Sequence, residues 1–423
     1  MQKNQPSVLR AWAMYDWANS AHNLVITSAI FPAYFASITK GNNGMINFFG
    51  WSVKNSILFS YAVSCAFLMV VILHPLLSGL ADFTGRKKQF MRFFVYLGAF
   101  STIILSFTTQ NNVVFSLFWF SLSLIGYSGS LVFYNAYLPE IATEDKFDYL
   151  SAKGYMLGYV GSVLLMLQNL TMIEMPSFYG NISNAFACQL SFLLVGIWWF
   201  VFGEYTLQNL PSNRTQISTN WWKESKMKLK STYAQIQKNK SIRLFLIGFF
   251  FYNMGLQTVM YIAAIFAEVE LKIPESNLII TILLIQLLAI FGAYSFAFLS
   301  RKMSNVNALK IGVFLWIFIC IAGYFITSDS FYFLAICIGF VMGGIQSLSR
   351  STFTKLMPVT DNKSSYFSMY EVVDKFGTVL GTFSFGLIEH FSGNVRNSIA
   401  FLVVYFLIGF IFLLRIKNTQ IKL

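Results

Sequence analysis

Residues 79–88 read GLADFTGRKK, a short polar segment that interrupts a long apolar run. Apolar stretches long enough to cross a bilayer lie on both sides of it, at roughly 55–80 and 90–109. A hydrocarbon core of about 30 Å requires about 20 mostly apolar residues in a helix. The segment therefore predicts a tight, charged turn between two membrane-spanning helices.

The composition of the whole chain indicates the same class of protein. Of 423 residues, 56% are hydrophobic and 11% are charged, which is too few charges to cover a water-soluble surface. We predict an all-α membrane protein with twelve transmembrane helices. They lie at roughly 11–38, 55–80, 90–109, 113–138, 152–174, 184–205, 243–267, 277–300, 308–327, 331–349, 365–388 and 398–415.

The net charge of +13 is explained by membrane topology. The basic residues lie in short loops and do not form a stripe with stacking aromatic residues, so we expect no nucleic-acid partner. If the N-terminus is cytoplasmic, most of the 30 Lys and Arg residues fall in cytoplasmic segments. This distribution follows the positive-inside rule and predicts that both termini are cytoplasmic.

One long polar stretch divides the predicted spans into two groups of six. Weak repeats relate the groups: Tyr-Asp at 15–16 in the first span is matched by Tyr-Asn at 252–253 in the seventh. Parallel repeats of this kind are typical of transporters with two pseudo-symmetric six-helix bundles. The predicted units are an N-terminal half, a cytoplasmic basic linker and a C-terminal half, at 1–205, 206–242 and 243–423.

The linker is rich in lysine and has two interpretations. Trp222, Leu229, Tyr233 and Ile236 could share one face of a helix. Such a helix would lie in the membrane interface and be attracted to anionic lipid. The alternative is a flexible, solvated tether.

The 79–88 segment has residues suited to a structured turn. Gly79 would permit close helix approach and Gly85 a tight turn. Asp82 could pair with Arg86 or with a nearby helix N-terminus, where a carboxylate is favoured. The alternative is that the segment is only a basic stop signal, which Arg86 and Lys87 would provide. Such a signal would not need Asp82 or either glycine. The equivalent segment of the second half, 299–303, lacks both the acid and the glycine.

The first span is the most polar of the twelve. Asp16, Asn19, Ser20, Asn23 and Thr27 fall on one face of an α-helix. Lipid cannot satisfy such groups, so we expect this face, with His22 beside it, to point into the bundle. Asp16 is a candidate proton- or cation-coupling acid. The alternative is a structural acid near the cytoplasmic end, salt-bridged or solvated.

Matching polar positions occur on other spans. Asn253, Gln257 and Tyr261 form a stripe on the seventh span. Tyr134 and Asn135 on the fourth span and Gln346 on the tenth add neutral hydrogen-bonding groups. A cavity lined by amides and aromatic rings would suit a small polar or zwitterionic solute. Structural hydrogen bonds between helices are the alternative, worth about 0.6 kcal/mol each.

Three charged residues enter the eleventh span. Glu371 and Lys375 are spaced i, i+4 and are expected to neutralise one another, with Asp374 beside them. We interpret the three as part of an intracellular gate in preference to a substrate contact.

The sequence carries no catalytic constellation. Its three histidines lie far apart, without metal-ligand spacing, and no phosphate-binding Gly-Lys-Ser/Thr loop occurs. The four cysteines lie inside apolar segments without paired spacing. We therefore expect no enzyme activity, no cofactor and no metal site.

Several segments resemble known transporters. The 79–88 segment resembles the signature loop of the major facilitator superfamily, between its second and third helices. Residues 11–20 (AWAMYDWANS) resemble the opening of the vacuole-effluxer-like family of that superfamily. Further matches to this family are YNAYLPEIA at 134–142, GGIQSLSRS at 343–351 and FGTVLG at 376–381.

The resemblance implies a fold and a function. It implies a secondary transporter whose two halves rock around a central site, with the 79–88 loop as a conformational latch between them. Fungal members of the family are linked to amino-acid release from the vacuole, so amino-acid efflux is favoured, with protons as a possible coupling partner. The chain resembles a bacterial member, expected as a monomer in the cytoplasmic membrane. A non-transporting receptor or scaffold, or an exporter of another metabolite or drug, remains an alternative.

Overall fold

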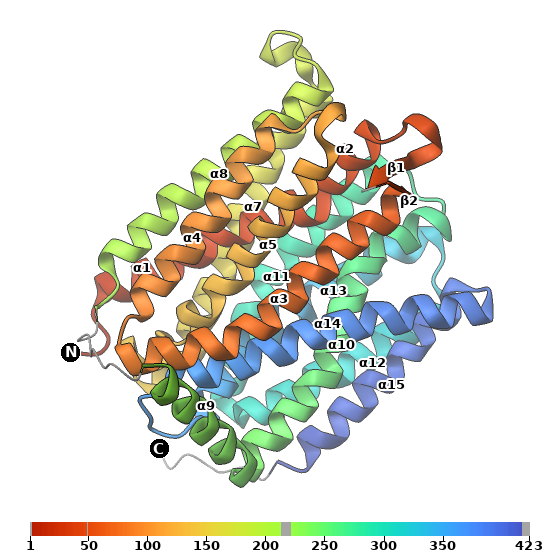
Figure 1. The fold of residues 1–423 in the computed structure, drawn as a ribbon. Coiled ribbons are helices and arrows are strands. Elements are labelled where there is room, and N and C mark those ends of the chain that lie inside the picture. Colours follow the sequence, from red (N-terminus) through yellow and green to blue (C-terminus); the bar gives the residue numbers. More distant parts are fainter. Residues whose placement is uncertain (1, 49, 213–220, 417–423) are drawn as a thin grey trace.

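The chain forms a bundle of long helices with one short hairpin (Figure 1). The computed structural model describes residues 2–48, 50–212 and 221–416. Part of the predicted linker, 213–220, therefore lies outside the described residues. The first span combines α1 (Pro6–Ala21), a π-helix (His22–Ile30) and α2 (Phe31–Ile38). The other helices are α3 (Asn55–Thr84), α4 (Lys87–Ile104), α5 (Val113–Asn135), α6 (Leu138–Ile141), α7 (Phe147–Glu174), α8 (Asn184–Asn209), α9 (Trp221–Lys238), α10 (Lys240–Val269), α11 (Glu275–Met303), α12 (Asn305–Phe325), α13 (Phe331–Leu356), α14 (Lys363–Ser392) and α15 (Val395–Leu414).

Eleven segments among the described residues are long and apolar enough to cross a membrane. Helix α14 has 30 residues and packs against α3, α10 and α15 inside the bundle. Its polar side chains, Asp374 and Lys375 among them, lower its hydropathy below that of the other spans. With α14 as the twelfth span, the predicted all-α fold of twelve transmembrane helices is confirmed.

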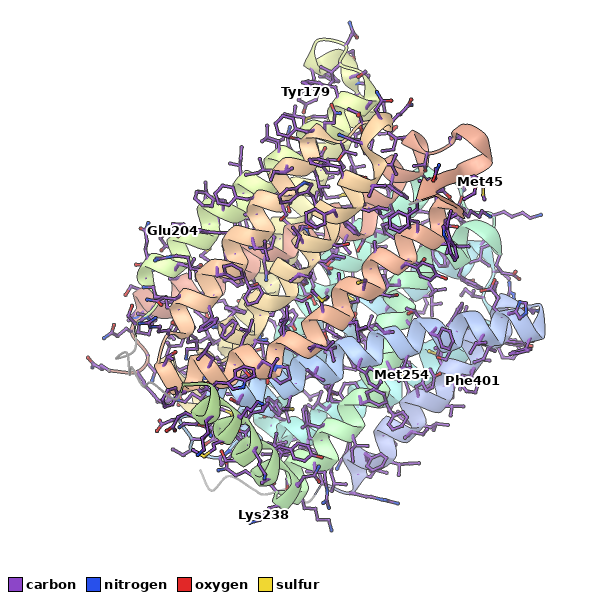
Figure 2. All side chains as sticks on the ribbon, in the orientation of Figure 1. Met45, Tyr179, Glu204, Lys238, Met254 and Phe401 are labelled. Atoms are coloured by element: carbon purple, nitrogen blue, oxygen red, sulfur yellow. The ribbon has the colours of Figure 1, made fainter. Side chains whose placement is uncertain are left out.

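The two ends of the bundle differ. We call the end where α1 begins, α15 ends and α9 lies the linker end (Figure 1). The other end carries the strands β1 (Met45–Phe48) and β2 (Trp51–Lys54), and we call it the hairpin end. In Figure 2, Met45 and Tyr179 mark the hairpin end and Lys238 marks the linker end. The sequence did not predict this antiparallel hairpin.

Large aromatic residues fill the interior, and apolar side chains cover much of the outside. Trp12, Trp199 and Trp316 are completely buried. Leu68 and Phe318 are more than half exposed, which suits a surface in contact with lipid tails. Helix α9 caps the linker end by packing on α3.

Helix α9 differs from the predicted linker helix in its orientation. Ile236 is buried, whereas Trp222 and Tyr233 are 46% and 55% exposed, so these residues do not share a buried face. The inward face instead carries Ser225 and Leu229, which approach Gly79 of α3. Over residues 221–238 the linker is therefore a helix docked on α3, and contact of its exposed face with lipid stays a prediction.

Candidate functional site

A buried ion pair joins the two halves in the linker-end part of their spans. Arg350 Nη2 on α13 lies 2.9 Å from Asp16 Oδ2 on α1. Tyr134 donates its hydroxyl proton to the same carboxylate oxygen at 2.9 Å. Arg350 and Asp16 are 2% and 5% exposed, so bulk water does not screen their attraction. We call this contact the central ion pair.

The guanidinium of Arg350 is held by the N-terminal half. It donates from Nε to Ser151 Oγ and from Nη2 to the Ser151 carbonyl oxygen, both at 2.9 Å. The rings of Trp12, Tyr134 and Tyr155 surround it, at 4.9, 5.5 and 4.3 Å from Cζ to the ring centroids. Arg350 belongs to the C-terminal half, and these partners belong to the N-terminal half. This arrangement of Ser151 and three aromatic rings around the guanidinium therefore exists only while the two halves are in contact at Arg350.

A second inter-half contact lies nearer the linker end. Asp148 at the start of α7 accepts hydrogen bonds from Ser300 and Asn305, at 3.1 and 2.6 Å, on either side of the α11–α12 turn. Lys355 Nζ on α13 lies 2.6 Å from the same carboxylate. The segment at 299–303, at the end of α11, has no acid of its own. It is bonded instead to Asp148 of the N-terminal half.

The 79–88 segment forms the third contact. Asp82 accepts the backbone N–H groups of Ser364 and Ser365 at 3.0 and 2.7 Å. These residues begin α14, where the helix dipole favours a carboxylate. Asp82 was predicted to pair either with Arg86 or with a helix N-terminus. In the structure it binds the N-terminus of α14. Gly85 ends α3 with φ of 68°, a left-handed conformation that glycine adopts without strain, and Arg86 is exposed.

Lys87 strengthens this third contact. Its ammonium lies 2.6 Å from Glu140 Oε1, and Lys363 of the C-terminal half lies 3.4 Å from the same oxygen. A Cβ added to Gly79 would lie 2.7 Å from the Ser225 carbonyl oxygen, so α9 packs where only glycine leaves room. The predicted latch residues, apart from exposed Arg86, therefore gather where α3, α9 and α14 meet.

The three charges of α14 do not pair as predicted. Lys375 Nζ lies 2.6 Å from Asp374 Oδ2, and Glu371 forms no ion pair with it. Glu371 instead accepts a hydrogen bond from Asn135 Nδ2 of the N-terminal half at 2.9 Å. Glu371 and Lys375 therefore make no direct ion pair in this state, because the ammonium bonds to its neighbour and the carboxylate bonds to an amide across the interface. Their two charges still act on one another, so mutual neutralisation stays a prediction.

The seventh-span stripe meets α14. Asn253 and Gln257 donate to Asp374 Oδ1 at 2.7 and 3.3 Å. Tyr261, the third residue of that stripe, is half-buried near Asp374 and Lys375. The stripe is therefore directed toward the charged part of α14.

Half-buried tyrosines lie near Lys375 or near one another. Tyr127, Tyr155 and Tyr261 lie within electrostatic reach of one another or of Lys375, and they come from α5, α7 and α10. Within the described part of the chain, their hydroxyls show no hydrogen-bond partner. We call Tyr127, Tyr155, Tyr261 and Lys375 the central cluster. Its position between the halves suits a binding site for a polar solute.

Gln346 lies at the interface between the halves. Its side-chain oxygen accepts the Tyr159 hydroxyl at 2.7 Å, which joins α13 to α7. The predicted candidates Tyr134, Asn135 and Gln346 thus all bond to residues of another helix in this state.

The polar face of the first span is split. Asp16 and Ser20 face α7, where a Cβ at Gly158 would lie 2.5 Å from the Ser20 hydroxyl. Asn19 and His22 point into the core of the N-terminal half, and His22 Nε2 lies 3.0 Å from Ser123 Oγ. Both residues point into the bundle, as predicted, but away from the contact of α1 with α7.

The π-helix explains part of this difference. From His22 onward the span winds with more residues per turn than an α-helix, so the predicted face rotates. Thr27 is buried, whereas Asn23 is exposed. Asn23 is therefore the member of the predicted stripe that solvent or lipid can reach.

Sequence analysis missed the residue at the centre of the interface. Arg350 was counted with the cytoplasmic loops because the tenth span was predicted to end at 349, whereas α13 continues to Leu356. A charged residue within a transmembrane helix indicates a functional site. A longer tenth span would therefore have identified Arg350. Lys355 gave no comparable signal.

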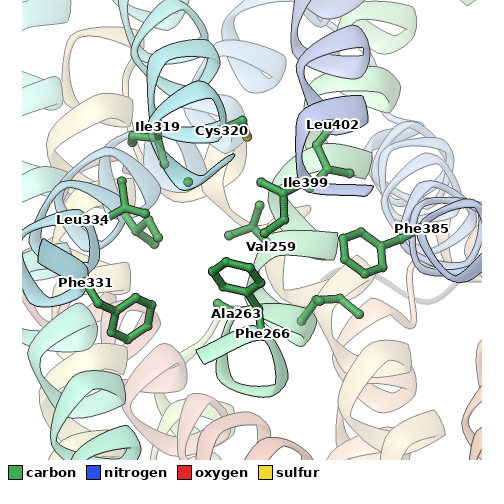
Figure 3. Close-up of a pocket in the computed structure, with 13 residues that line it drawn as sticks. Val259, Ala263, Phe266, Ile319, Cys320, Phe331, Leu334, Phe385, Ile399 and Leu402 are labelled. Carbon is green, nitrogen blue, oxygen red and sulfur yellow. The ribbon is translucent and has the colours of Figure 1, made fainter. Parts of the chain in front are cut away.

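A small cavity of about 50 Å³ lies elsewhere, inside the C-terminal half (Figure 3). Its lining is apolar and comes from α10, α12, α13, α14 and α15, including Val259, Phe266, Phe331, Phe385 and Leu402. It offers no charged group and therefore differs in chemistry from the central cluster. No group of three metal-ligating side chains occurs among the residues described.

Comparison with known proteins places the chain in a family. The family model described as "Vacuole effluxer Atg22 like" matches residues 4–422. A Bacillus subtilis protein named "Uncharacterized MFS-type transporter YxiO" is 28% identical over 98% of this chain and 95% of its own length. Autophagy-related protein 22 of Saccharomyces cerevisiae is 26% identical over 81% of this chain and 74% of its own length.

Solved structures show the same fold. The major facilitator transporter FucP in its outward conformation matches with a TM-score of 0.71 at 13% identity, over 98% of this chain and 99% of that one. A bacterial homologue of the iron transporter ferroportin, in an outward-facing state, matches with a TM-score of 0.66 at 12% identity, over 96% and 98%. The chain therefore belongs to the vacuole effluxer Atg22-like family of membrane transporters and has the major facilitator superfamily fold.

Proposed function

We propose that the protein exports a small zwitterionic solute, with amino acids as the first candidates, by alternating access. The observation that carries the proposal is the uneven distribution of inter-half contacts. Asp16, Asp148 and Asp82 each bond to the other half, and all three lie in the linker-end part of their spans. Halves held together at one end are what a transporter open toward the other end requires.

The central cluster supports the zwitterionic solute. Lys375 offers an ammonium for a carboxylate, and Asp374 beside it offers a carboxylate for an ammonium. The unpaired hydroxyls of Tyr127, Tyr155 and Tyr261 add donors and acceptors. Polar groups of this kind fix the orientation and identity of a ligand that binds between them. A purely apolar solute would leave these groups unsatisfied.

The direction of transport rests on two further observations. The basic segments gather at the linker end, which indicates that this end is cytoplasmic. The matching family is described as vacuole effluxers, which favours export. In this proposal the protein works as a monomer in a bacterial cytoplasmic membrane, and Asp16 holds the halves together through Arg350.

Counterflow in proteoliposomes tests the proposal. Vesicles containing purified protein are loaded with an unlabelled amino acid and exposed to trace amounts of the same labelled amino acid, for leucine, tyrosine, glutamate and lysine in turn. We expect accumulation of label for at least one zwitterionic amino acid. No accumulation for any member of the panel would contradict the proposed substrate class.

A cross-linked variant provides the control. Ala152 of α7 packs with Ala297 of α11 at the linker end, so Ala152→Cys and Ala297→Cys in a background without other cysteines should form a disulfide. The oxidised variant should lose counterflow and the reduced variant should regain it. Full counterflow by the oxidised protein would contradict alternating access.

A further inference from the structure

Four acidic side chains are buried between the halves, and three of them have a cation as partner. Asp16 pairs with Arg350, Asp374 with Lys375 and Asp148 with Lys355. The fourth acid, Glu371, is 3% exposed and shows no cation within ion-pair distance among the described residues. Its hydrogen-bond partner is the neutral amide of Asn135.

A buried carboxylate without a cation is unfavourable. Desolvation of an isolated charge costs several kcal/mol, and such a group takes up a proton instead. The three paired acids are each neutralised by their own cation. A charged Glu371 would therefore leave one uncompensated negative charge at the interface, whereas a protonated Glu371 leaves none.

The titratable groups around α14 do not remove this charge. Lys375 of α14 and, more weakly, Arg350 of α13 act on Glu371 beyond ion-pair distance. The ammonium of Lys375 is bonded to Asp374, and the guanidinium of Arg350 is bonded to Asp16. Helix α9 contacts α14 through the neutral Gln235. Other titratable groups on the packed helices include Asp82 and His74 of α3, Tyr127 and Tyr134 of α5, Tyr155 of α7, Tyr252 and Tyr261 of α10, Tyr370 of α14 itself and Tyr405 of α15.

Glu371 also lies at a contact between the two halves. Its bond to Asn135 joins the halves on the linker side of the central cluster. Lys375 follows Glu371 by one helical turn toward the hairpin end. Parting of the halves would break the Asn135 contact and expose Glu371 to water from the linker end.

We propose that Glu371 is the site of the coupling proton. In the state described here it is protonated, and the neutral acid stabilises the closed linker end. When the linker end opens, the Glu371 carboxyl releases its proton to water there and becomes a hydrated carboxylate. The linker end closes again when the ammonium of the bound solute compensates the Glu371 carboxylate. When the solute leaves toward the hairpin end, Glu371 takes up a proton from that side.

The direction of this proton follows from the cycle. Each cycle carries one proton from the hairpin end to the linker end. An exported solute moves the opposite way, so the protein would work as a proton antiporter. This inference rests on the alternating access of the proposed function and assigns its coupling to Glu371 instead of Asp16.

Distance measurements between spin labels test the inference without any solute. Labels at Glu144→Cys and Val359→Cys, both exposed and on opposite halves at the linker end, report its opening in nanodiscs. For one titrating proton, the ratio of open to closed protein should rise by up to about tenfold per pH unit. Glu371→Gln, which keeps an oxygen acceptor for Asn135, should stay closed at every pH.

Two variants serve as comparisons. Glu389→Gln changes an acid of the same helix near the hairpin end and should retain the wild-type pH dependence. Asp16→Asn should open more readily but should still respond to pH. Wild-type opening that does not depend on pH, or a pH response that survives in Glu371→Gln, would overturn the assignment.

Infrared difference spectroscopy gives an independent measurement. The carbonyl stretch of a protonated carboxyl should appear in the wild type at neutral pH, persist in Asp16→Asn and disappear in Glu371→Gln. A band that persists in Glu371→Gln would overturn the assignment. Neither measurement requires transport, so a negative counterflow result with a positive pH response would reject the proposed substrate and leave the proton site standing.

Discussion

The linker end and the hairpin end hold their helices together in different ways. At the linker end, Asp16, Asp148 and Asp82 each bond to the opposite half. At the hairpin end, Arg396 bonds to Glu270 and to carbonyl oxygens of the same half. These linker-end contacts therefore hold the halves together, whereas the bonds of Arg396 at the hairpin end stabilise one half only. This difference indicates which interactions must break during a transport cycle.

Arg350→Ala should have the largest effect on the linker end. It removes the cation from a buried pair and leaves Asp16 uncompensated, which costs about 3–5 kcal/mol in the closed state. The ratio of open to closed protein should rise at least about a hundredfold, measured with the spin labels at positions 144 and 359. Asp16→Asn combined with Arg350→Gln should open less than Arg350→Ala, because no charge is left unpaired. Equal opening of the two would contradict a role for the ion pair.

Asp148→Ala should also open the linker end, but less than Arg350→Ala does. Lys355 loses its partner but is partly exposed, so solvent compensates part of the loss. A hydrogen bond to a charged group contributes about 1.5–3 kcal/mol, so we expect a shift of about tenfold or more in the same distance measurement. Asp145→Ala, which removes an exposed acid in the preceding turn, is the matched control and should leave the equilibrium unchanged.

Gly79→Leu should displace α9. A Cβ at this position already meets the Ser225 carbonyl oxygen, and overpacking costs about 1–3 kcal/mol. We expect a lower midpoint of thermal unfolding and faster proteolysis of the linker. Gly386→Leu provides the control, because nothing lies within 4 Å of a Cβ there. Equal destabilisation by the two changes would show that helix α9 does not depend on Gly79.

Arg396→Ala should have the smallest effect on the opening of the linker end. Its partners lie in the same half and far from the central ion pair, and distant sites act additively within about 0.5 kcal/mol. The midpoint of thermal unfolding should fall while the distance between positions 144 and 359 stays unchanged. A clear change in that distance would mean that the hairpin end also controls closure.

The sequence predicts the fold well because hydropathy and charge act over whole segments. The twelve spans, the two halves and the structured turn at 79–88 can be predicted without knowing any individual contact. The predicted end of the tenth span at 349 shows the limit, because an error of a few residues placed Arg350 in a loop when it lies in the interface.

The site is harder to predict because partner choice depends on three-dimensional position. Spacing allows Lys375 to pair with Glu371, but only the packing of α14 on α5 brings Asn135 to Glu371. The second-half turn at 299–303 lacks an acid, yet Ser300 binds the acid of the opposite half, Asp148. The π-helix at His22–Ile30 rotates the polar face of the first span. Rules based on α-helical spacing do not predict this rotation. Pairing across halves therefore requires the fold itself.

Two distances measured in the same protein test the account most directly. One pair of spin labels lies at the linker end, at positions 144 and 359, and a second pair lies at the hairpin end, at the exposed residues Phe178 and Phe391. The account predicts that Arg350→Ala lengthens the first distance and shortens the second in the same population. Lengthening at the linker end with no change at the hairpin end, or no change at either end, would contradict alternating access controlled by the central ion pair.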